Sequence, residues 1–228
     1  MLNNSLHLTY NKLKKHNANT VTTKVDTVYS DKTYSRIVDN SAYLISQNFK
    51  EIDVDREIKK ADSIFADVNI KFFNEFKKYK YAQYRHLSNQ EMMKSISNSY
   101  YQNNEILYHN PAYMSLFNQV YKDYFQYFGR TEKGGKIYQD INKLESYSAL
   151  NNTLQQDSIL ANDTLRELVI LKCLYDEFYN DKFSRKAMLK ILDSLSLSTQ
   201  NPEHLLIAKN IRNKVTKLLT GYGPPQFQ

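Results

Sequence analysis

The sequence of 228 residues predicts an all-α protein, an irregular multi-helix bundle. It has only 5 Gly and 4 Pro, where average usage would give roughly 16 and 11. Because sheets need these residues at their turns, the scarcity argues against a β-sandwich or barrel. Apolar side chains also recur at spacings of three and four residues, which is typical of amphipathic helices. A hydrophobic content of 41% with 24% charged residues is typical of a globular chain.

In the first part of the chain the pattern predicts helices over 2–17, 31–49, 55–66, 69–87 and 89–102. Residues 19–30 differ, because β-branched residues alternate with polar ones there. That pattern fits an extended segment or a loop better than a helix.

In the middle of the chain a helix is expected to begin at Asn110-Pro111, an N-cap residue followed by proline at the first helical position. One apolar stripe continues this helix through Met114, Phe117, Tyr121, Tyr124 and Phe128. Gly129 would end it in the left-handed conformation. A further helix is predicted over 136–156, after a pair of glycines.

Three helices are predicted near the end of the chain. The first runs from about Asp163 to Tyr179, with Thr164 and Glu167 spaced as a capping box. It is apolar nearly all round, so we expect it in the middle of the bundle. Ser184 would cap the second. The third would begin at Asn201-Pro202 and end at Gly221, with an inward stripe of Leu205, Ala208, Ile211, Val215 and Leu218.

The chain is basic, with 31 Lys and Arg against 24 Asp and Glu, a formal net charge of +7. The densest basic stretch is 69–87, where aromatic residues interleave with a candidate interaction patch made of Lys77, Lys78, Lys80 and Arg85. Such interleaving can bind nucleic acid, because bases stack on rings while cations contact phosphates. The favoured interpretation is an amphipathic helix whose rings enter the core while its lysines reach water.

The sequence nominates no catalytic residue, cofactor site or metal site. Its single cysteine, Cys173, rules out Cys-x-x-Cys, an intrachain disulfide and a cysteine zinc site, and its apolar surroundings predict a buried, unreactive thiol. The five histidines are scattered, and His109 and His204 at helix starts suit capping or turn roles. No run approaches the ~18 apolar residues of a membrane span.

The last eight residues, 221–228, predict a linker that leads from a helical domain of residues 1–220 into another domain. The candidate linker residues are Gly221, Gly223, Pro224, Pro225 and Phe227. This stretch is similar to Gly-x-x-Ala-Pro-x-Phe-x-Leu, the motif that opens TlpA/ResA-like thioredoxin domains, with Pro224 in place of the usual alanine. Residues 108–114, 165–172, 201–204 and 207–211 resemble the helical region that precedes such domains in certain Gram-negative bacteria.

The resemblance implies a non-catalytic helical domain of an exported thiol–disulfide oxidoreductase that serves cell redox homeostasis. Its partners would be its own C-terminal thioredoxin domain, which carries the family's Cys-x-x-Cys and lies beyond this chain, and periplasmic protein substrates. The domain would position the thioredoxin domain, contribute to recognition of those substrates, or both. Export to the periplasm would require a signal sequence upstream of residue 1. No cofactor is implied, and no catalytic residue carries over to this chain.

Two alternatives remain open from the residues themselves. The first is a stand-alone glycan- or peptide-binding helical protein that uses the 19 tyrosines and the many asparagines; it would need a groove lined by exposed tyrosine rings. The second is a nucleic-acid-binding helical domain built on the 69–87 patch, which would need a continuous positive face.

Overall fold

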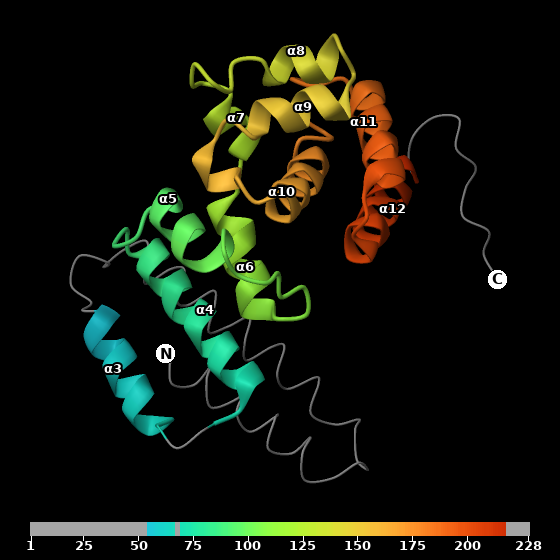
Figure 1. Ribbon diagram of the computed structural model, residues 1–228. Coiled ribbons are helices and arrows are strands. Elements are labelled where there is room, and N and C mark those ends of the chain that lie inside the picture. Colours follow the sequence, from blue (N-terminus) through green and yellow to red (C-terminus); the bar gives the residue numbers. More distant parts are fainter. Residues whose placement is uncertain (1–53, 67–68, 218–228) are drawn as a thin grey trace, which may run out of the picture. The chain divides into compact units, whose positions relative to one another are not determined.

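The computed structural model describes residues 54–66 and 69–217, which form helices and loops without a strand (Figure 1). The predicted all-α class is therefore confirmed over these residues. The expected helices at 2–17 and 31–49, the segment 19–30 and the linker 221–228 lie outside the described residues. The chain divides into two compact units, Met1–Ile96 with Leu107–Phe117, and Ser97–Ile106 with Asn118–Gln228.

The first unit contains α3 (Val54–Ile64), α4 (Lys71–Leu87), α5 (Met93–Ile96) and the first part of α6 (Pro111–Val120). Helices α3 and α4 lie side by side (Figure 1). Aromatic residues form the core of this unit. The ring of Phe65, just after α3, lies 5.2 Å from that of Phe73 on α4, edge to face, and the ring of Tyr79 on α4 lies 4.8 Å from that of Tyr113 on α6. The predicted helices at 55–66 and 69–87 are confirmed.

The helix expected at 89–102 has a different form. It begins only with α5 and continues as a π-helical turn, η1 (Ser97–Tyr101), which belongs to the second unit. A π-turn adds one residue to the turn of the helix. Apolar spacing alone does not reveal such an insertion.

Helix α6 begins as predicted, because the Asn110 side-chain oxygen accepts hydrogen bonds from the backbone N–H groups of Ala112 and Tyr113, both at 3.1 Å. The prediction of a single helix from Pro111 to Gly129 is wrong. Helix α6 ends at Val120, and a new helix, α7 (Tyr124–Phe128), begins after Asp123, whose backbone is left-handed with a φ of 51°. Aspartate tolerates this conformation better than most residues do.

The role expected for Gly129 is also wrong, since its φ is −61° and it remains right-handed. A close approach explains the glycine instead: a Cβ here would lie 2.7 Å from the Phe125 carbonyl oxygen.

The helix predicted over 136–156 is likewise two helices, α8 (Ile137–Asn142) and α9 (Tyr147–Leu154). Glu145 adopts a left-handed φ of 48° between them. The Ser146 hydroxyl then caps α9 by accepting from Ala149 N–H at 3.2 Å. A short 3₁₀ turn, η2 (Ser158–Leu160), follows.

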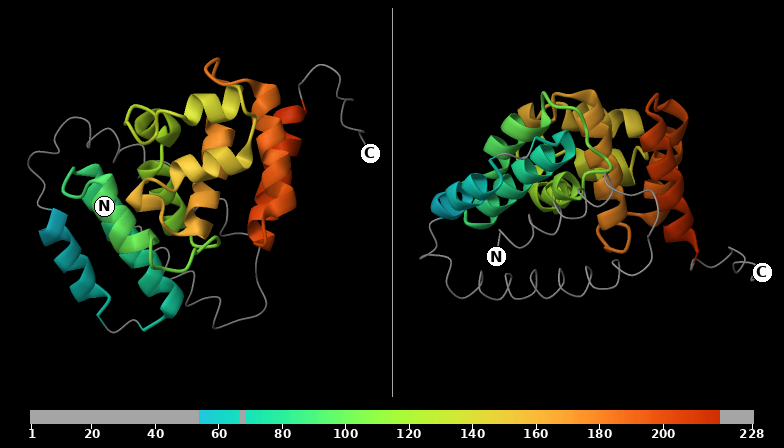
Figure 2. Two further views of the ribbon diagram at one scale, coloured as in Figure 1. Left: turned by 45° about the horizontal axis from the view of Figure 1, so that its top comes forward. Right: turned by 90° about the horizontal axis from the view of Figure 1, so that it is seen from below.

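Helix α10 (Asp163–Asp176) is the central helix of the second unit, as its apolar circumference predicted. It contacts α9, α11 (Arg185–Ser198), α12 (Pro202–Thr216) and η2. Helices α11 and α12 lie side by side in both views of Figure 2. On α12, Ala208 and Val215 are buried, while Leu205 and Ile211 are half-buried.

Two of the three predicted caps in this region are confirmed. Ser184 caps α11 through Ala187 N–H, and Asn201 caps α12. The capping box of Thr164 and Glu167 is wrong, because Asn162 caps α10 by accepting from Leu165 N–H at 2.9 Å. Glu167 is consequently available for a different contact.

Candidate functional site

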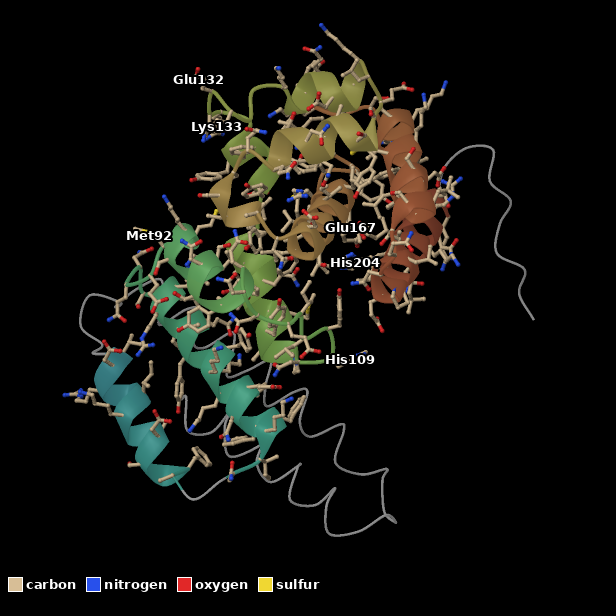
Figure 3. The ribbon with its side chains drawn as sticks, viewed as in Figure 1. Met92, His109, Glu132, Lys133, Glu167 and His204 are labelled. Carbon is tan, nitrogen blue, oxygen red and sulfur yellow. The ribbon has the colours of Figure 1, made fainter. Side chains whose placement is uncertain are left out.

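A buried polar cluster of the second unit joins α10 to α12. Glu167 projects from α10, and His204 lies in the first turn of α12 (Figure 3). His204 Nδ1 donates to Glu167 Oε1 at 2.6 Å, and the imidazole has no exposed surface. The Thr199 hydroxyl, at the end of α11, donates to the same oxygen. Tyr147 Oη, at the start of α9, donates to Glu167 Oε2 at 3.2 Å. One carboxylate therefore accepts hydrogen bonds from donors on three structural elements.

The electrostatics of this cluster favour an ionised carboxylate. Burial by itself raises the pKa of Glu167, but the hydrogen bonds from His204 and Thr199, the charge of His204 and the Tyr147 hydrogen bond together hold that pKa below its usual value. Burial and the neighbouring Glu167 charge raise the pKa of Tyr147. Tyr147 therefore stays a neutral donor to a charged acceptor, the stronger kind of hydrogen bond.

A carboxylate that orients an imidazole is also the geometry of a general base. Two features argue for a structural role here. The imidazole is fully buried, so no substrate can reach it. The neighbouring Thr199 hydroxyl donates to the carboxylate rather than to the imidazole, so it is not arranged as a nucleophile that the imidazole activates. The cluster thus orients and fixes α12.

Further contacts hold α12 along its length. At its start, the Asn201 side-chain oxygen accepts from Glu203 N–H at 3.0 Å and from His204 N–H at 3.4 Å. In its last turn Val215 is buried, and the Lys214 ammonium lies 4.7 Å from the centre of the Tyr175 ring. Anchoring at both ends leaves α12 little freedom to move against α10.

A buried arginine performs a similar structural task at the other side of α10. Arg166 is 3% exposed, and its Nε donates to Asn151 Oδ1 on α9 at 2.8 Å. Its Nη1 donates to the Leu160 carbonyl of η2 at 2.7 Å. Because a buried guanidinium is costly unless its donors are satisfied, these bonds fix α9 and η2 against the start of α10.

Two buried tyrosines complete the polar core of the second unit. Tyr121 Oη lies 2.7 Å from the Ser97 hydroxyl of η1, and Tyr124 Oη donates to Asp157 at 2.6 Å. Burial is the main cause that raises the pKa of both phenols. Neither ring is exposed, so both are structural donors.

Cys173 is buried in α10, as predicted. Burial is also the main cause that raises the pKa of its thiol. A thiol that resists ionisation is a poor nucleophile.

The four residues of the predicted basic patch all lie on α4 and have partners. Lys77 Nζ lies 2.7 Å from Asp62, and Arg85 lies 3.0 Å from Asp55. Lys80 is buried and donates to Gln83, and Lys78 lies 5.4 Å from the Tyr79 ring centre. The prediction that the rings enter the core is confirmed for Phe73, Phe76, Tyr79 and Tyr81. The prediction that the lysines reach water is wrong for Lys80, which can be buried because its ammonium donates to the Gln83 side chain.

The described residues contain no cluster of three or more metal-binding side chains of the His, Cys, Asp and Glu types. Within the same residues, no helix combines the length and apolar character that crossing a membrane requires. The five candidate linker residues between 221 and 228 lie outside the described part of the chain.

The Glu167–His204 pair was not predicted from the sequence. One signal was available: Glu167 directly precedes the apolar run of residues 168–171 in α10, and a carboxylate beside buried residues needs partners. The partner lies 37 residues away, however, and only the packing of α12 on α10 identifies it.

Comparisons of the chain with protein-family models, curated proteins and solved structures found no match.

Proposed function

We propose that this chain is the non-catalytic helical domain of an exported, periplasmic thiol–disulfide oxidoreductase. Its role is to hold a thioredoxin domain, joined through residues 221–228, in a limited range of orientations. A contribution to the recognition of protein substrates is the second part of the proposal.

The anchoring of α12 is the observation that carries the proposal. This helix directly precedes residues 218–228, and a domain attached there can be oriented only if the helix itself is fixed. The Glu167–His204 hydrogen bond near its start and the Lys214–Tyr175 contact in its last turn join it to α10, and the Asn201 cap stabilises its first turn. Pro224 and Pro225 restrict two backbone φ angles just beyond, which favours a semi-rigid link.

The presence of a single cysteine supports a non-catalytic role for this chain. Thiol–disulfide exchange within one domain uses an attacking and a resolving cysteine. The chain has one cysteine, and it is buried. Redox chemistry would therefore come from the attached domain.

The alternatives find less support in the described residues. A glycan- or peptide-binding groove needs clustered exposed tyrosine rings. Many of the tyrosines are buried, Tyr101, Tyr113, Tyr121 and Tyr124 among them, and Tyr127, Tyr138 and Tyr179 are the ones more than half exposed in the described residues. A nucleic-acid face on α4 would require a partner to compete with the carboxylates that already pair with its cations.

The coding frame beyond Gln228 provides the first test. We expect a Cys-x-x-Cys within about 60 residues, in a strand–helix context typical of a thioredoxin domain. A frame that continues without such a pair would contradict the proposal.

Insulin reduction provides the second test. The longer protein should reduce insulin, whereas residues 1–228 alone should match their own Cys173→Ala variant. Reduction by residues 1–228 above that variant would show that the helical domain itself is catalytic.

A further inference from the structure

A group of rings, some exposed and some buried, and exposed cations lies on the second unit around the end of α10 and the loop to α11. Tyr179 is 57% exposed, and Tyr138, at the start of α8, is 52% exposed. We call the following group the aromatic–cation surface: Tyr138, Tyr175, Tyr179, Lys182, Phe183, Arg185 and Lys214.

Each cation of this surface lies against a ring. The Arg185 guanidinium carbon is 5.8 Å from the centre of the Tyr179 ring, and Lys214 Nζ is 4.7 Å from that of Tyr175. Lys182 Nζ is 5.6 Å from the centre of the Phe183 ring. A cation within about 6 Å of a ring centre is attracted by the ring's quadrupole, so these contacts help to hold the three cations in place.

The loop that carries these side chains is fixed to α8. Asn142 donates from Nδ2 to the Lys182 carbonyl at 3.2 Å and accepts from Ser184 N–H at 2.7 Å. The buried Phe183 ring lies 6.1 Å from the Phe125 ring and 6.4 Å from the Tyr138 ring. A surface held in place in this way loses little conformational freedom when it binds a partner.

The charge of the surface is positive. Neighbouring lysines are paired, Lys190 with Glu145 and Lys172 with Asp176. In contrast, none of the three cations of the aromatic–cation surface forms an ion pair with a carboxylate of residues 54–66 and 69–217. Asp181 is an exposed acidic residue in the same loop. Two further acids lie in the same segment: Asp176, which pairs with Lys172, and the buried Glu177. Three cations against Asp181 and Glu177 leave a small net positive charge for an anionic partner.

We propose that the aromatic–cation surface binds a carboxylate-rich peptide segment of another protein. Tyrosine and arginine are the residue types that most often dominate protein interfaces, and carboxylates pair with cations already held in place. A nucleobase, in contrast, needs a bare ring face to stack on, and here the cations occupy ring faces. The inference goes beyond the proposed function and uses only described residues of the second unit.

Fluorescence anisotropy with a labelled 12-residue peptide of alternating Glu and Tyr tests the proposal on the full chain. We expect saturable binding, and we expect the Arg185→Gln, Lys214→Gln double variant to weaken it about tenfold. The matched control is the Arg130→Gln, Lys133→Gln double variant, which removes the same charge from exposed residues outside the surface. A peptide with Gln in place of Glu and a 12-mer of deoxythymidine are the two alternative ligands.

The control variant and the Gln peptide decide specificity. The control should bind the acidic peptide as the wild type does, and the Gln peptide should bind at least tenfold more weakly. Equal loss in both double variants would mean attraction by net charge alone and would overturn the proposal. Absence of binding, or tighter binding of the deoxythymidine 12-mer that Arg185→Gln, Lys214→Gln abolishes, would also overturn it.

Discussion

Replacing Glu167 by alanine removes the acceptor on which the attachment of α12 depends. The fully buried His204 Nδ1–H loses its partner, and so do the hydroxyls of Thr199 and Tyr147. An unsatisfied buried donor costs about 1–3 kcal/mol, and the two partly accessible hydroxyls add less because water can reach them. We therefore expect a loss of about 3 kcal/mol in the free energy of unfolding. For a domain of this size that lowers Tm by about 6–12 °C.

Thermal unfolding followed by far-ultraviolet circular dichroism measures the loss, with hydrogen exchange of residues 202–217 as the local readout. Exchange in α12 should accelerate by roughly 100-fold, the ratio that corresponds to about 3 kcal/mol. Glu132→Ala is the matched control, because Glu132 is exposed on a loop (Figure 3). A Tm for Glu167→Ala equal to that of Glu132→Ala would refute the anchoring role.

The same variant should show a distinctive pH dependence. The folded-state pKa of Glu167 lies below its ordinary value of 4.5, so the unfolded state binds the proton more readily. The carboxylate therefore stabilises the fold fully above about pH 4.5, and this contribution is lost as pH falls through the folded-state pKa. The Tm difference between wild type and Glu167→Ala should shrink as the pH falls below about 4.5. A difference that grows on acidification would contradict the assignment of an ionised Glu167.

Three further predictions concern other parts of the second unit. The thiol of Cys173 should react with a thiol reagent only after unfolding, because it is buried and its pKa is raised; rapid labelling of the native chain would contradict this. Gly134→Ala should lower the free energy of unfolding by about 1–3 kcal/mol, because a Cβ there would lie 2.1 Å from the Phe128 carbonyl oxygen. Gly135→Ala is the control: a Cβ there has no neighbour nearer than 3.6 Å, so its free energy of unfolding in urea should be nearly unchanged. Asn201→Ala should cost about 1 kcal/mol through loss of the α12 cap, also measured by urea unfolding; an unchanged midpoint would show that the cap contributes nothing.

The parts of the fold that depend on local chemistry were predictable from the sequence. Asn110, Ser184 and Asn201 each cap a helix as expected, because an N-cap needs only its own side chain and the next three backbone amides. The central place of α10 followed from its apolar circumference for a similar reason.

The breaks within helices were not predictable in the same way. A single left-handed residue, Asp123 or Glu145, ends a helix without disturbing the apolar pattern on either side. Tyr121 and Tyr124 both remain buried, so the stripe looks continuous although the helix is not. Aspartate and glutamate occur in many other conformations, so neither residue type predicts a left-handed residue and a helix end at its position.

The buried polar cluster was missed because its members are distant in sequence. His204 at a helix start suited a capping role, and Glu167 suited a capping box. Both interpretations assigned a local partner to a side chain whose actual partner lies on another helix. Only the packing of α12 against α10 brings the two together.

Interdomain distances in the longer protein test the central claim, that a fixed α12 and a stiff link orient an attached domain. One spin label would replace Leu206, which is 53% exposed on α12, and the other would be placed on the proposed thioredoxin domain, with any Cys-x-x-Cys found there changed to serine. The account predicts a narrow distance distribution that broadens when Pro224 and Pro225 are both replaced by glycine, while the Tm of the helical domain stays nearly unchanged. A distribution of the same width in both proteins would contradict it, because the orientation would then come from a contact between the domains and not from the link.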